Sequence, residues 1–68
     1  MGWHYRVRKR QDKGQDIFDI VEYYDDPGAW TTDGIKPLAE SYDDLVRELK
    51  MMLADALKHP VLVEEENS

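Results

Sequence analysis

The chain has 68 residues, of which 41% are hydrophobic and none is cysteine. This length allows a single domain, and a domain this short buries only about 60% of its unfolded surface, so its core gives little stability. The lack of cysteine excludes a disulfide framework and a cysteine-based zinc site. The chain is nevertheless too apolar to be disordered.

No segment approaches the roughly 20 apolar residues that a membrane span requires, and the first residues hold no apolar run of signal-peptide length. We therefore expect a cytoplasmic protein without a membrane partner.

The net charge of -6 is unevenly distributed. Residues 1–14 hold five basic residues against one acid, a balance of +4, and residues 15–68 carry -10. Such a basic strand on an acidic body usually reflects internal charge pairing or solubility, and less often a binding surface.

Residues 3–10 alternate between apolar and basic side chains, which predicts a half-buried strand. Residues 11–15 are polar and include Gly14, and residues 16–24 read as a second strand. The short connection predicts an antiparallel hairpin in which Val7 faces Ile20. On the opposite face, Arg8 then meets Asp19.

The segment Asp25-Asp26-Pro27-Gly28 predicts a turn, because proline suits its second position and glycine tolerates positive φ. Residues 29–32 follow as a short third strand. Residues 35–38 then form an extended connection, in which Pro37 argues against a central strand.

The sequence predicts a helix that begins after Ser41 as N-cap and stops before Pro60. Its apolar residues share one stripe, which we expect to cover the Trp3, Tyr5 and Val7 face of the hairpin. The stripe consists of Tyr42, Leu45, Val46, Leu49, Met52, Leu53, Ala56 and Leu57.

After the helix, the apolar run of residues 61–63 could pack under the helix, add to a sheet edge or reach another chain. Residues 64–68 are predicted to be an acidic flexible tail. The prediction is thus one α+β domain over residues 1–63. It has a three-stranded antiparallel sheet in strand–strand–strand–helix order, one amphipathic C-terminal helix and an apolar C-terminal extension.

A helix covers only one face of such a sheet, so apolar residues on the other face would form a contact surface for a second copy or another protein. The predicted interaction surface consists of Ile17, Val21, Tyr23, Trp30, Val61, Leu62 and Val63.

The basic face of the first strand suggests a different function. Arg6, Arg8 and Arg10 could bind the phosphates of a nucleic acid. Alternatively, they pair with the acids of the second strand and the helix, and the charge of -10 on the rest of the chain favours this second interpretation.

Metal and catalytic sites are not expected. His4 and His59 lack a metal-ligand spacing, and Asp25-Asp26 lacks the alternating oxygen ligands of a calcium loop. The chain has no glycine-rich phosphate loop and no nucleophile elbow. We therefore predict no enzyme activity, no cofactor and no metal.

Several short motifs follow one another along nearly the whole chain: Trp-x-Tyr-Arg-Val from Trp3, Val-Glu-Tyr-Tyr-Asp from Val21, Glu-Ser-Tyr-Asp-Asp-Leu from Glu40 and Lys-His-Pro-Val-Leu from Lys58. Their order resembles a family of short uncharacterised bacterial proteins. The resemblance implies a strand–strand–strand–helix domain and no assigned activity. A looser similarity, in which a hairpin leads into a Leu-rich helix, is to the partial double-stranded-RNA-binding-like domain of HicB-type antitoxins.

The leading hypothesis is a small non-enzymatic protein-interaction module that pairs with itself or with another protein. The alternatives are nucleic-acid binding through the basic face, and an acidic nucleic-acid mimic or antitoxin-like protein.

Overall fold

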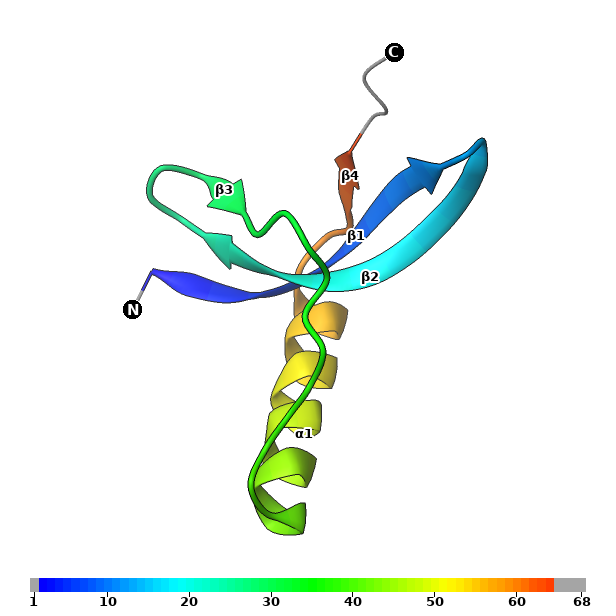
Figure 1. The fold of residues 1–68 in the computed structure, drawn as a ribbon. Helices are drawn as coiled ribbons and strands as arrows, with labels where there is room; N and C mark the ends of the chain where they lie inside the picture. Colours follow the sequence, from blue (N-terminus) through cyan, green and yellow to red (C-terminus); the bar gives the residue numbers. More distant parts are fainter. Residues whose placement is uncertain (1, 65–68) are drawn as a thin grey trace.

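The computed structural model describes residues 2–64, which form an α+β fold with one helix and a curled, mixed four-stranded sheet. The elements are β1 (Trp3–Asp12), β2 (Gln15–Tyr24), β3 (Ala29–Trp30), α1 (Tyr42–Lys58) and β4 (Leu62–Glu64). The strand order in the sheet is β3-β2-β1-β4. Figure 1 shows α1 extending away from the sheet, with the connection from β3 running beside it.

The hairpin forms in the predicted register, with Val7 opposite Ile20 and Arg8 opposite Asp19. Both strands are longer than predicted, because only Lys13 and Gly14 make the turn. These two residues have φ values of 53° and 80°. Two consecutive positive φ values give the turn the twist that matches a right-handed hairpin, so pairing continues to its end.

The prediction of a purely antiparallel, three-stranded sheet is wrong, because β4 joins the sheet beside β1 and runs parallel to it. Leu62 lies opposite Arg8 and Val63 lies opposite Lys9. Of the three placements that the sequence left open for the apolar run of residues 61–63, the structure shows addition to a sheet edge. The helix supplies the crossover that parallel strands need. Glu64 belongs to β4, so the predicted tail begins one residue too early, and residues 65–68 lie outside the described residues.

The sheet curls so that its two edge strands approach each other. Trp30 in β3 donates from Nε1 to Glu64 Oε1 in β4, at 2.9 Å. We call the enclosed side the inner face; it carries Arg8, Val21 and Leu62, which are 0%, 0% and 9% exposed. The expectation that this side of the hairpin is bare is therefore wrong, because the curl and the segment after β3 cover it.

The helix has the predicted N-cap: the Asp44 N–H donates to Ser41 Oγ at 3.1 Å. Its C-terminal half packs on the other face of the sheet, where Tyr5 is 5% exposed and Met52 4%. Trp3 and Val7, also predicted to be covered, are half-buried. The described chain measures 42 × 27 × 19 Å, an elongated shape consistent with the projecting helix.

Candidate functional site

Much of the predicted buried stripe of α1 is exposed, which corrects the expectation that the sheet covers it. Tyr42, Leu49, Leu53 and Leu57 are 81%, 44%, 61% and 80% exposed. They lie seven, four and four residues apart, so they share one side of the helix. We call these four residues the outer helix face. Leu38, on the connection before α1, is also 87% exposed.

The outer helix face is exposed because a different side of α1 contacts the sheet. The backbone N–H of Tyr5 donates to Asp55 Oδ2 at 3.0 Å, and its hydroxyl donates to Glu48 Oε1 at 3.4 Å. Burial, followed by the charge of Glu48, raises the pKa of Tyr5, so this hydroxyl remains a donor. Because these polar contacts fix the rotation of the helix, its apolar sector points only partly at the sheet.

The C-terminal end of α1 is held by β1 in a second way. The rings of His4 and His59 stack with centroids 3.7 Å apart, and Arg6 donates two hydrogen bonds to the carbonyl oxygen of Pro60, at 3.0 and 2.8 Å. Burial, with the charges of His4 and Lys58, lowers the pKa of His59. The base of the helix is thereby fixed while its first turns extend beyond the sheet.

The predicted interaction surface does not form one exposed patch. Val21 and Leu62 are buried on the inner face, and Ile17, Tyr23 and Trp30 are half-buried. Of that set, Val61 and Val63 are exposed, at 48% and 63%. Sequence reasoning assigned the bare apolar side to the sheet, whereas the structure places it on the helix.

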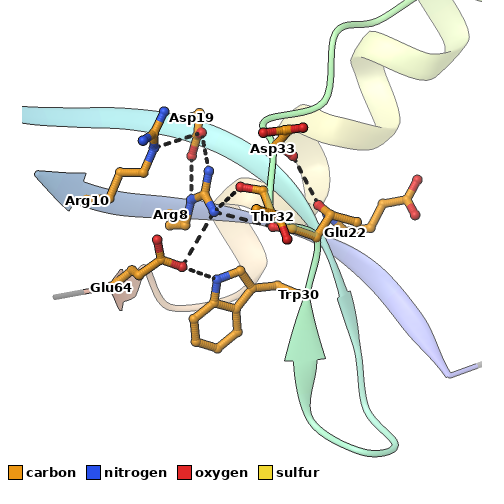
Figure 2. A network of polar contacts seen from close by, with 9 residues as sticks. Arg8, Arg10, Asp19, Glu22, Trp30, Thr32, Asp33 and Glu64 are labelled. Atoms are coloured by element: carbon orange, nitrogen blue, oxygen red, sulfur yellow. Dashed lines mark hydrogen bonds and ion pairs between the residues drawn. The ribbon is translucent and has the colours of Figure 1, made fainter. Parts of the chain in front are cut away.

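Arg8 is the centre of a polar network on the inner face, shown in Figure 2. It donates from Nη2 and Nε to the two carboxylate oxygens of Asp19, at 2.6 and 3.0 Å, and from Nη1 to the carbonyl oxygens of Thr31 and Thr32. Glu64 Oε1 lies 3.6 Å from Nη1. The hydrogen bonds to Asp19 raise the pKa of Arg8. One guanidinium thus connects β2, β4 and the segment after β3.

The arginines proposed as nucleic-acid contacts are used inside the chain. Arg8 has no exposed surface with which to reach a phosphate. Arg6 lies over the ring of Tyr23, 4.8 Å from its centroid, in addition to its bonds to Pro60. Arg10 Nε lies 3.6 Å from Asp19 Oδ2. Arg8 and Arg10 thus pair with an acid of the second strand, Asp19, as the alternative interpretation of the sequence expected. The contacts of Arg6 are instead with the Pro60 carbonyl oxygen and the Tyr23 ring.

An open groove of about 950 Å³ lies beside this network, lined by Arg10, Asp19 and residues 31–36. The groove is lined by two basic residues, Arg10 and Lys36, and by two acids, Asp19 and Asp33, so its formal charges balance. Gly34 is packed closely here, because a Cβ atom at that position would lie 2.8 Å from Asp19 Oδ2. We assign no ligand to this groove.

Within residues 2–64, no group of three or more His, Asp or Glu side chains is arranged to hold a metal ion. In the same part of the chain, no helix is long and apolar enough to cross a membrane.

Comparison with known proteins gives no relative: no protein-family model, no curated protein and no solved structure matches the chain. The resemblance to short bacterial proteins and to HicB-type antitoxins therefore stays a prediction.

Proposed function

We propose that the chain is a non-enzymatic protein-interaction module that binds its partner through the outer helix face. The observation that carries this proposal is the exposure of Tyr42, Leu53 and Leu57, each more than half accessible on one side of a well-formed helix. Monomeric proteins rarely expose large contiguous apolar patches unless the patch is a binding surface.

The geometry of this surface favours a protein partner. The exposed residues are spaced as in helices that lay an apolar face against another helix or into a groove. Tyr5 fixes the base of this helix through its hydrogen bonds to Asp55 and Glu48. Because the helix is already held in one orientation, a partner that binds it loses little affinity to the entropy of ordering it.

A photo-crosslinking residue at a single position tests this function. We expect p-benzoylphenylalanine in place of Leu53 to form adducts with protein in cells that produce the chain. The matched control replaces Met51, which is 48% exposed on the opposite side of the helix and should form few adducts. Equal adduct yields at both positions, or none at position 53, would contradict the proposal.

Nucleic-acid binding and acidic mimicry stay predictions. Because Arg6, Arg8 and Arg10 all have partners within the chain, no observation favours adding nucleic-acid binding as a second function.

A further inference from the structure

We propose that the partner of the outer helix face is a second copy of this chain, with the two α1 helices antiparallel. This inference rests on the proposed function and adds the identity and the orientation of the bound protein. Three properties of α1 support it: the area of its apolar face, the direction of its dipole and the alignment of its side chains.

The exposed area suits a pair of helices. The outer helix face exposes on the order of 500 Å² of mostly apolar surface, compared with the roughly 800 Å² that each partner contributes to a standard interface. The whole described chain exposes 5443 Å², so the patch is about a tenth of its surface, as expected for the interface of a small protein. A second helix of the same length, about 25 Å, covers it from end to end.

The dipole of α1 favours an antiparallel self-pair. The first turn carries Asp43 and Asp44, and the last turn carries Lys58. In an antiparallel pair, the helix dipoles oppose each other, which is favourable. Asp44 and Lys58 take no part in the contact, because they lie seven residues before and after Met51, on the side of α1 that points away from it. A parallel pair would align the two dipoles, so that like ends of the helices lie side by side.

Lys50 flanks the outer helix face and lies near Lys50 of the second copy in the antiparallel pair. Its long stem can cover apolar surface while the ammonium group stays in water. A two-fold axis near residues 49 and 50 has a further consequence. It sets Tyr42 of each copy against Leu57 of the other and brings Leu53 against Val46.

The lack of cysteine in the sequence permits an unambiguous test of orientation. Tyr42→Cys and Leu57→Cys chains, mixed and oxidised with copper–phenanthroline, should form the mixed disulfide in preference to either self-disulfide. Both positions are more than three quarters exposed, so the substitutions should leave the fold intact, which circular dichroism checks. Met51→Cys, on the opposite side of the helix, is the control and should remain mostly unlinked.

Light scattering on the unmodified chain should give twice the mass of 8.0 kDa. Leu53→Glu should weaken self-association by about tenfold or more, because it places a charge in the centre of the apolar contact. Leu57→Lys provides a second variant at the end of the same face. Met51→Lys should remain dimeric.

The outcomes separate this inference from the proposed function. If the chain is a strict monomer and the crosslinking residue at position 53 captures a different protein, self-pairing is wrong and the interaction function is retained. A strict monomer without adducts overturns both. Efficient self-disulfides of Tyr42→Cys indicate parallel helices and overturn the antiparallel arrangement.

Discussion

Arg8 shows how much of this fold depends on a single side chain. It is fully buried, and its guanidinium supplies the donors for the Asp19 carboxylate and for two backbone carbonyls. Removing one partner of a buried ion pair costs about 3–5 kcal/mol. Without Arg8, Asp19 keeps only the more distant Arg10, whose Nε lies 3.6 Å from Oδ2, and the carbonyl oxygens of Thr31 and Thr32 lose their donor. A core of this size supplies only about 3–5 kcal/mol in total. Arg8→Met should therefore be largely unfolded at 25 °C by circular dichroism.

The matched control for that substitution is Arg47→Met. Arg47 pairs with Asp44 on the exposed side of α1, with Nη1 and Oδ1 3.0 Å apart. Exposed pairs of this kind contribute about 0.5 kcal/mol or less, so this variant should unfold at nearly the same urea concentration as the original chain. An Arg8→Met chain that stays as stable as Arg47→Met would contradict the structural role given to the network.

The stacked pair of His4 and His59 makes a prediction about pH. Burial lowers the pKa of His59 below its ordinary value. As the pH falls, the imidazole of His59 is therefore protonated in the unfolded chain at a higher pH than in the folded chain. Stability is therefore complete above about pH 6.5 and is lost as the pH falls below it. Thermal melts should show a Tm that decreases between about pH 7.5 and pH 5.5.

His59→Phe separates this effect from the titration of the acids. Phenylalanine keeps an aromatic ring at the stacking position but binds no proton, so the decrease in Tm over this pH range should become smaller. An unchanged decrease would show that another group causes it.

At the scale of elements, the start of α1 depends on one cap. Ser41 Oγ accepts the Asp44 N–H, and Ser41→Ala should cost about 1 kcal/mol. In a domain this small, a loss of that size lowers Tm by about 4–8 °C. Ser41→Asp, which retains an oxygen acceptor at the N-cap, should preserve most of the stability. If Ser41→Ala and Ser41→Asp lower the Tm equally, the N-cap hydrogen bond does not supply the stability assigned to it.

The sequence predicted those elements that local patterns determine. The alternation of residues 3–10 and the turn at Gly14 were sufficient to place Val7 opposite Ile20, and the N-cap and Pro60 were sufficient to bound α1. Each of these signals lies within the element or beside it. Pairing between β1 and β4 was left open, because residues 61–63 form a run too short to specify a partner strand.

The candidate site was predicted less well, for a physical reason. Helical periodicity shows that Leu49, Leu53 and Leu57 share a side, but it does not show what covers that side. The rotation of α1 is decided by contacts between distant residues, such as Tyr5 with Asp55, 50 positions apart. Likewise, the sequence predicted that Arg8 lies opposite Asp19, but the burial of Arg8 depends on the curl that brings Trp30 to Glu64.

At the scale of the whole molecule, the burial of charge and the exposure of apolar surface are related. The described chain buries an arginine on its inner face and leaves Leu53 and Leu57 of its helix largely in water. A short domain with this distribution gains apolar burial from association. Self-association through α1 would therefore contribute to folding as well as to binding.

This coupling predicts that Tm depends on protein concentration. A partner that binds only the folded chain stabilises it by about 2.7 kcal/mol at one hundred times its dissociation constant. For a domain of this size, the Tm should then rise by roughly 10 °C or more between dilute and concentrated samples. Leu53→Glu should remove the dependence, since it weakens the dimer without disturbing Tyr5 or Arg8. A Tm that stays constant over a hundredfold range of concentration, or a dependence that Leu53→Glu leaves intact, would contradict the coupling of folding to pairing through this face.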